Sequence, residues 1–513
     1  MEQERSRSGG RRTRNVILEG SIVRALLTLS VPIILGNLLQ AGYQLTDAFW
    51  VGRLGAAAVA AVAVGAPVTF LVIALGSGLA MAGAVLVAQY AGAGRQDMVD
   101  HVAGQTMTMV LITSVLLGTL GYLLAPDLLT LLGVACDVRA GALGFMRVSF
   151  VGIVFVFSYT MFQALMRGIG RTRLPLLIVL GTVLLNFALD PLFIFGWGPL
   201  RGAGVVGAAS ATLITQGLAA AIGLAILLRG RHGIHLRWEQ LRPNPGYIRR
   251  AFLLGLPGSI DLSTRALGFI AMSLLVAGFG TQSTAVYGVG STIIQVVTIP
   301  AAGLSMALST LVGQNLGAGQ AARAEKIARL SIIYGFGALS AWGIVAFATA
   351  PVLVAFFVPS DPQVVAAGTG FLRIMALTWG FIGIQYCIAA VLRASGQMIP
   401  AMTIALVYQW IVQLPIAYAL STQTSLKIYG VWWSFPISNM IAAFLALAWF
   451  ARSKWNNARP NTEMRQIVIA TPAMLSSERP LGGLMCADEG SREIAVGISA
   501  PMAPTPRCRD DDT

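Results

Sequence analysis

Twelve long apolar segments follow one another along the chain, separated by short polar connections. They lie near residues 25–50, 57–86, 102–125, 145–166, 174–196, 203–228, 252–276, 283–312, 328–357, 370–392, 400–420 and 430–451. An α-helix of about 20 apolar residues crosses the hydrocarbon core of a bilayer. Because a spanning segment must satisfy its own backbone hydrogen bonds, the pattern predicts an all-α, polytopic membrane protein with twelve transmembrane helices.

The composition excludes several other classes of protein. Hydrophobic residues make up 56% of the 513 positions and charged residues 11%, whereas soluble domains carry about 25% charged residues. The net charge of +14 does not indicate nucleic-acid binding, because the basic residues lie in short clusters between apolar segments. The four cysteines and three histidines lack the spacing of a zinc site or a disulfide framework. We therefore expect no resident cofactor.

The distribution of Lys and Arg predicts the orientation of the helices. These residues gather in the N-terminal segment and in every second connection, and the positive-inside rule places that side in the cytoplasm. We expect a multi-pass protein of the cell inner (plasma) membrane with both termini cytoplasmic. The predicted parts are a basic tail (1–21), a six-helix lobe (22–230), a cytoplasmic linker (231–250), a second six-helix lobe (251–452) and a disordered cytoplasmic tail (453–513).

An internal repeat relates the two halves. GLAMAGAVLVAQYAGAG, from position 78, recurs as GLSMALSTLVGQNLGAG from position 303, so Gln89 and Gln314 correspond at a displacement of 225. Arg167 and Arg393 correspond at a displacement of 226. A repeated six-helix unit returns to the side on which it began, which predicts parallel repeats with a cavity between two lobes. That architecture is typical of a transporter.

The stretch NFALDP places two polar side chains in an otherwise apolar segment. Asn186 and Asp190 are four residues apart and share one helix face, where an ionised carboxylate needs a partner or water. Pro191 is expected to free the carbonyl oxygen of Phe187 one turn earlier. A carboxylate, an amide and a free carbonyl suit a proton or a hard cation. The alternative is that the pair only joins neighbouring helices.

The first apolar segment carries a stripe of polar residues that could face the Asn186–Asp190 pair. Spaced by three, four and three residues, its members are Asn37, Gln40, Gln44 and Asp47. Such a stripe faces protein or water rather than lipid, and structural bonding between helices is again the alternative. If Asp47 meets Asn186 and Asp190, two carboxylates share a poorly hydrated pocket that favours retention of a proton. These three residues are the predicted cation-coupling site, and would be the metal ligands if the coupling ion is Na+.

The second half does not repeat these acids. Met272, Val412 and Ile416 occupy the corresponding positions, which favours a functional over a scaffolding role for the acids. The second half has its own pair, Asp261 and Arg265, four residues apart. The pair either neutralises itself within one helix or lines the inter-lobe cavity and contacts substrate. The polar Gln295 and the adaptable aromatic Tyr43 are further candidates for the cavity wall.

The sequence resembles the multidrug and toxic compound extrusion (MATE) family over roughly residues 20 to 450. The resemblance rests on the order of several segments along the chain, together with the internal repeat. The segments that carry the resemblance are VPIILGNLLQAGYQLTDAFWVGRLG, LVAQYAGAGR, ALMRGIGRTRLP, NFALDPLFIFGWGPLRGAGVVGAASATLITQ, GLPGS and LVGQNLGAG. The resemblance implies antiport by alternating access, in which H+ or Na+ flows inward and amphiphilic, often cationic small molecules leave between two lobes. It also implies that Asp47, Asn186 and Asp190 form the cation site, with Thr212 as a weaker member. We expect a monomer within the lipid bilayer.

The sequence departs from the family at one place. A branch of the family carries a second acidic site in the second lobe, with a glutamate in the seventh helix and an aspartate in the tenth. At the aligned positions this chain has Arg265 and apolar residues near Ile382. Coupling is therefore expected in the first lobe.

Two other functions are alternatives to drug antiport. A flippase for lipids or lipid-linked oligosaccharides, from the same superfamily, would need a lateral opening and a cationic cavity, for which Arg265 is the obvious deep cation. An intramembrane enzyme using NFALDP as a prenyl-transfer motif would need a second acidic cluster to hold Mg2+. The sequence contains no such cluster, so we expect a transporter and not an enzyme.

Overall fold

The computed structural model describes residues 16–134, 136–197, 200–358, 361–453 and 455. Most of the predicted basic tail and all but two residues of the predicted disordered tail lie outside these ranges. The first lobe contains six long helices. They are α2 (Ile22–Gly52), α3 (Ala56–Gly92), α4 (Gln96–Leu131), α5 (Cys136–Gly168), α6 (Arg173–Phe195) and α7 (Gly204–Arg229). A hairpin of two short strands, β1 (Gly196–Trp197) and β2 (Leu200–Arg201), follows α6.

The connection between the lobes is shorter than predicted. It contains a 3-10 turn, η1 (Trp238–Leu241), and ends where Asn244 caps α8 by accepting a hydrogen bond from the backbone N–H of Tyr247 at 3.3 Å. Gln105 on α4 holds the connection in place, because its side-chain amide donates to the carbonyl oxygens of Gln240 (2.7 Å) and Arg242 (2.8 Å). The linker is therefore packed against the first lobe.

The second lobe contains the remaining helices. They are α8 (Pro245–Ala277), α9 (Thr281–Gly317), α10 (Ala321–Phe357), α11 (Pro362–Ala376), α12 (Trp379–Ala394), α13 (Met398–Leu406), η2 (Val407–Gln413), α14 (Leu414–Thr422) and α15 (Ile428–Arg452). Helices α11 and α12 form one broken span with a 49° bend. The π-helical η2 precedes Pro415, whose missing N–H and bulky ring disturb the regular α-helical bonding.

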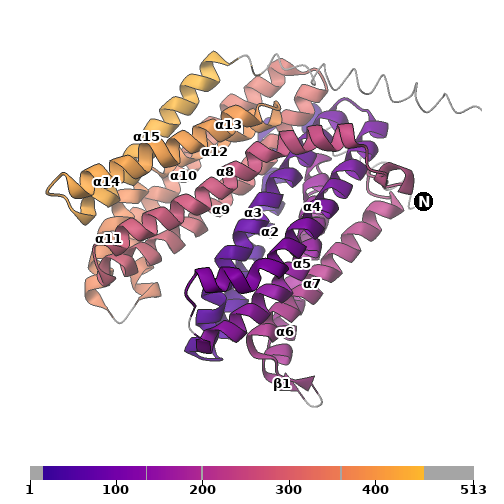
Figure 1. The fold of residues 1–513 in the computed structure, drawn as a ribbon. Coiled ribbons are helices and arrows are strands. Elements are labelled where there is room, and N and C mark those ends of the chain that lie inside the picture. The colour runs from indigo at the N-terminus through magenta and orange to yellow at the C-terminus, as the bar shows by residue number, and fades with distance from the viewer. Residues whose placement is uncertain (1–15, 135, 198–199, 359–360, 454, 456–513) are drawn as a thin grey trace, which may run out of the picture. The chain divides into compact units, whose positions relative to one another are not determined.

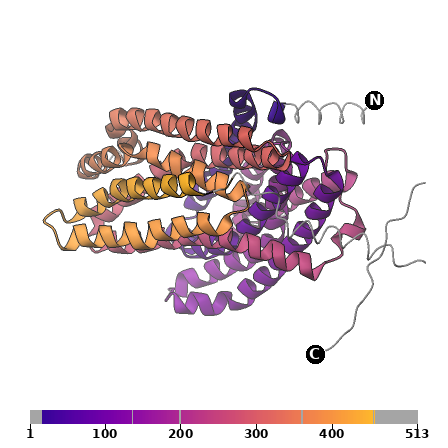
Figure 2. The ribbon, with the colours of Figure 1, turned by 90° about the horizontal axis from the view of Figure 1, so that it is seen from above.

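Within the described residues, eleven helices are long and apolar enough to span a membrane, or twelve when the bent pair counts as one. The prediction of a twelve-helix, all-α membrane protein is confirmed. Several helices extend beyond the apolar segments; α4, for example, begins at Gln96 and ends at Leu131. Figure 1 shows α2 to α7, indigo to magenta, as one group and α8 to α15, pink to yellow, as another. In Figure 2, α14 and α15 lie side by side as a helical hairpin.

The two lobes meet through α2 and α3 of the first and α8 and α9 of the second. Gly78 on α3 lies against the backbone of Ser259 on α8, and Gly303 on α9 lies against Ile34 on α2, so closely that a Cβ at either glycine would overlap its neighbour. Both members of each crossing are displaced by 225 from those of the other. The repeat seen in the sequence is therefore a pseudo-twofold relation at the lobe interface.

Candidate functional site

Asn186 and Asp190 form the buried centre of the first lobe. Both are 0% exposed, and their four-residue spacing turns them to the same side of α6, which packs against α2 and α7. Helix α6 continues through Pro191 to Phe195. A buried carboxylate in this environment is costly unless hydrogen bonds, a proton or a cation stabilise it.

The side-chain amide of Asn186 joins two carboxyl groups. Its Nδ2 donates to Oδ1 of Asp47 at 2.7 Å and to Oδ2 of Asp190 at 2.9 Å. Asp47 comes from α2 and is half-buried. Nδ2 of Asn186 thus bonds to both Asp47 and Asp190, which brings the three predicted cation-coupling residues together. Their role in coupling stays a prediction.

The side-chain oxygen of Asn186, on the other side of the amide, also forms hydrogen bonds. Its Oδ1 accepts from the hydroxyl of Tyr43 at 2.8 Å and from Oγ1 of Thr215 at 3.3 Å. The two hydroxyl groups lie 2.7 Å apart. The shorter bond, donated by Tyr43, holds the amide oxygen away from the carboxyl groups and turns the amide nitrogen toward them.

The carboxyl oxygens are incompletely satisfied. Thr212 on α7 donates to Oδ2 of Asp47 at 3.3 Å, whereas Oδ1 of Asp190 is buried and has no hydrogen-bond partner among the described residues. No ion pair joins either carboxyl group to a Lys, Arg or His in the described ranges. Two carboxyl groups that share one donor and lack a basic partner are a place for a proton or a monovalent cation.

The site does not have the composition of a transition-metal centre. In the described part of the chain, no three His, Cys, Asp or Glu side chains are grouped so that they could hold a metal ion. The available groups are two carboxyls, one amide and three hydroxyls, which bind protons or hard cations.

The other residues of the polar stripe lie elsewhere. Asn37 and Gln40 line a hollow of about 60 Å³ between α2, α5 and α6, together with Arg167. Gln44 is exposed. Among the described residues no hydrogen bond joins these stripe residues to the acids, so within this part of the chain Asp47 is the one stripe residue brought to Asn186 and Asp190.

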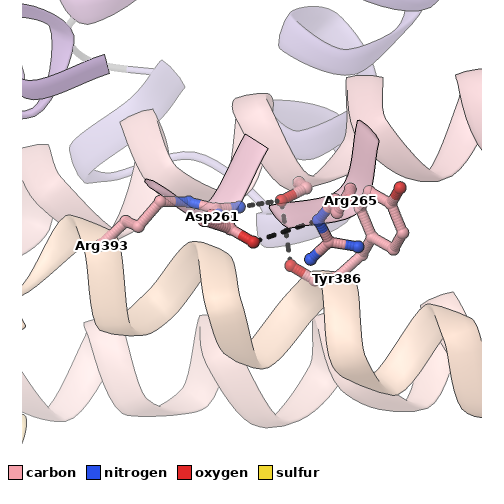
Figure 3. Close-up of polar contacts among 5 residues, drawn as sticks. Asp261, Arg265, Tyr386 and Arg393 are labelled. Carbon is pink, nitrogen blue, oxygen red and sulfur yellow. Dashed lines mark hydrogen bonds and ion pairs between the residues drawn. The ribbon is translucent and has the colours of Figure 1, made fainter. Parts of the chain in front are cut away.

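In the second lobe, Asp261 lies between two arginines (Figure 3). Its Oδ1 is 3.1 Å from Nε of Arg265, and its Oδ2 is 3.5 Å from Nη1 of Arg393. Arg393 also donates to Oγ of Ser305 at 3.0 Å. The predicted intrahelical pair is present but belongs to a larger cluster, and Gln295 is exposed on α9 outside it.

Two of these contact residues were not predicted from the sequence. Thr215 lies three residues after Thr212 on the same face of α7, a spacing that would have identified it. Arg393 stood out only as a member of the repeat, and nothing local indicates that it reaches Asp261, 132 positions earlier. Tyr43 was placed at the cavity wall, whereas it is 4% exposed and bonded to Asn186.

The fold and the buried acid site define a multi-pass membrane protein with the architecture of a secondary transporter. The MatE family model matches residues 32–192 and 257–419, one segment in each lobe and more than half of the chain in all. The chain belongs to the MatE family.

Curated relatives and solved structures agree with this assignment. The chain is 28% identical over 439 residues to the probable multidrug resistance protein YoeA of Bacillus subtilis, covering 84% of this chain and 94% of the relative. It is 26% identical to the FAD transporter of Shewanella oneidensis, and the match covers 83% of this chain and 94% of that relative. A MATE structure in complex with MaL6 superposes with a TM-score of 0.80 at 24% identity, covering 85% of this chain and 96% of the other.

Proposed function

We propose that this protein is a proton-coupled efflux transporter of amphiphilic small molecules. Family membership supports the class, and the relative YoeA is named as a probable multidrug resistance protein. A second relative, from Staphylococcus haemolyticus, is named the multidrug export protein MepA. These names favour small-molecule export over lipid flipping. We place the protein in the cell inner membrane with cytoplasmic termini, acting as a monomer on substrates that are often cationic.

The observation that carries the proposal is the bridge from one Asn186 nitrogen to Asp47 and Asp190. The three side chains come from two helices, so the bridge ties α2 to α6. A proton taken up on the free Oδ1 of Asp190 removes the negative charge of that carboxyl group and adds a donor, while Oδ2 still accepts from Asn186, but more weakly. The repulsion between Asp190 on α6 and Asp47 on α2 falls at the same time. Loading the site therefore changes the interactions between two helices of the first lobe.

The orientation of the amide favours a proton over Na+ as the coupling ion. The N–H2 group points at both carboxyl groups, while the amide oxygen is bonded to Tyr43 and Thr215 on the other side. A Na+ ion needs oxygen ligands and would have to turn this amide or displace it. A proton requires only an oxygen with a free lone pair, and Oδ1 of Asp190 is one.

Alternating access would connect this site to the second lobe through α2. Helix α2 packs against α6 in its own lobe and against α9 of the other lobe. A change in the bonding between α2 and α6 thus acts on a helix that is also part of the lobe interface. We infer that proton binding shifts the balance between states open to opposite sides of the membrane.

Efflux of ethidium from proteoliposomes with an imposed pH gradient tests the proposal. We expect Asp47→Asn and Asp190→Asn to abolish gradient-driven efflux while the protein is still produced and folded. Asp97→Asn is the matched control, because that exposed carboxylate pairs with Arg95 at the start of α4 and not with the site. Efflux at the wild-type rate by both site variants would refute the proposed site.

The coupling ion is tested separately. Addition of ethidium to purified protein in weak buffer should release H+ whether or not Na+ is present, and Asp190→Asn should abolish the release. Release that requires Na+, or substrate-dependent Na+ binding without H+ release, would replace the proton with Na+ as the coupling ion.

A further inference from the structure

The Asp261 cluster in the second lobe carries more positive than negative charge. Arg265 and Arg393 share one carboxylate, and among the described residues no other acid pairs with either guanidinium. Asp261 is buried, with 5% of its side chain accessible, and 13% of the Arg393 side chain is accessible. A surplus cation inside a membrane lobe is costly unless it has a function or an anionic partner.

Arg265 carries hydrogen-bond donors that the described cluster does not use. It donates to Asp261 through Nε, and the structure records no partner for its two terminal amino groups within the described ranges. Its side chain is 41% accessible. The guanidinium lies 5.6 Å from the ring centre of Tyr386, beside which Figure 3 shows it. An aromatic face and a carboxylate thus hold the guanidinium while its outer N–H groups stay available.

Both terminal nitrogens of Arg393 already have partners within the cluster. One of its terminal nitrogens faces Asp261, and the other donates to Ser305, whose hydroxyl donates in turn to the carbonyl oxygen of Tyr386 at 2.9 Å. Arg393 therefore stabilises the carboxylate and anchors it to α9 and α12. Removal of the Arg265 charge would leave a one-to-one ion pair between Asp261 and Arg393.

The cluster adjoins the contact between the lobes. Arg265 lies six residues beyond Ser259, where α8 crosses α3, a separation of about 9 Å along the helix. Arg393 directly precedes Ala394, whose carbonyl oxygen accepts a hydrogen bond from Gln89 of the first lobe at 2.8 Å. A molecule bound at Arg265 would therefore sit beside the interface that must rearrange during transport.

We propose that Arg265, held by Asp261 and Tyr386, is a recognition site for a carboxylate or phosphate group on a transported amphiphile. Its two terminal amino groups match the two oxygens of such an anion. The proposal rests on the efflux function above and adds a substrate class that carries an anionic group. The phosphate of an anionic lipid offers the same chemistry, so the test distinguishes the two sources.

Binding of two matched pairs of fluorescent compounds to protein in nanodiscs tests the site. The pairs are FMN with riboflavin and norfloxacin with its methyl ester, which differ by a phosphate and by a free carboxylate. In phosphatidylcholine nanodiscs we expect the anionic member of at least one pair to bind at least about tenfold more tightly than its partner. Arg265→Gln should remove this difference, Arg265→Lys should keep part of it, and Arg373→Gln, at an arginine on α11, should leave it unchanged.

The outcomes separate this proposal from the proposed function. If Arg265 is the site, Asp190→Asn loses pH-driven ethidium efflux while still preferring the anionic compound. Equal binding within both pairs, or an unchanged preference in Arg265→Gln, overturns the proposal and leaves the coupling site untouched. Saturable, Arg265-dependent binding of phosphatidylglycerol that displaces the dyes assigns the site to lipid instead and also overturns it.

Discussion

Gln89 and Gln314, which correspond in the sequence repeat, donate reciprocal hydrogen bonds across the lobe interface. The side-chain amide of Gln89 donates to the carbonyl oxygen of Ala394 at 2.8 Å, and that of Gln314 donates to the carbonyl oxygen of Gly168 at 2.7 Å. The two acceptors are themselves related by the displacement of 226. The pseudo-twofold pair of bonds closes the end of the interface that we predict to be cytoplasmic, and a state open to that side must break both.

The first prediction is that loss of these glutamines favours the state open to the cytoplasm. Gln89→Ala and Gln314→Ala each remove one inter-lobe bond, worth about 1 kcal/mol, and the double variant removes both. We expect labelling of cysteines introduced near this interface to increase stepwise from single to double variant. Gln385→Ala is the matched control, because Gln385 donates to the carbonyl oxygen of Asn439 within the second lobe at 3.0 Å. No increase in labelling of the double variant would contradict the prediction.

The second prediction concerns the backbone contact beside these bonds. Gly317 on α9 packs against the carbonyl of Gln89, and a Cβ there would overlap that oxygen. Gly317→Ala should therefore separate α3 from α9 and reduce ethidium efflux by at least about tenfold, with greater cysteine labelling at the same end. Gly337→Ala, on α10 with open space around it, should leave both measurements unchanged. Normal efflux by Gly317→Ala would show that the helices do not need this close approach.

The third prediction distinguishes the effect of the Asn186 amide orientation on transport from the effect of the acidic residues themselves. Tyr43→Phe removes the stronger donor to Oδ1 of Asn186, so the amide is no longer held toward the carboxyl groups. We expect proton-driven efflux to fall by about tenfold without being abolished, in line with the loss of one buried hydrogen bond. The exposed Tyr418 provides the control Tyr418→Phe. Complete loss in Tyr43→Phe would instead make the hydroxyl part of the proton pathway.

These sites show what local sequence patterns can and cannot predict. Spacing identified Asp47 and the Asn186–Asp190 face, because helical periodicity places residues three or four positions apart on one side. Periodicity does not show which distant helix a side chain meets, so the Asp261–Arg393 contact was not predicted. The bend between α11 and α12 was also missed, since hydropathy measures apolar length and not helix direction.

The fourth prediction concerns pH and the connection between the lobes. Burial lowers the pKa of His232, and the positive charges of Arg171 and Arg231 lower it further. Nη1 of Arg171 lies 3.2 Å from Nδ1 of His232, which accepts this bond only when neutral. Because the folded state disfavours the protonated ring, this stabilisation is present above the ordinary pKa of about 6.5 and is lost as pH falls through the lowered value.

The corresponding measurement is thermal unfolding at pH 7.5 and pH 5.0. We expect His232→Gln to lose less stability between these two values than the wild type. The effect should be small, because His232 is partly exposed and the solvent screens its neighbours. An identical decrease in the two proteins would show that His232 does not contribute.

The fifth prediction is that Asp261 stabilises the second lobe by neutralising two arginines. Asp261→Asn leaves two guanidinium groups close together without a carboxylate, at a cost of about 3 kcal/mol, so yield and melting temperature should fall. Arg265→Gln retains the Asp261–Arg393 pair and should melt close to the wild type. The double variant Asp261→Asn/Arg265→Gln carries one arginine fewer and should recover part of the loss, since the repulsion between the guanidiniums is gone. A double variant no more stable than Asp261→Asn would show that packing of the aspartate, rather than its charge, maintains this part of the lobe.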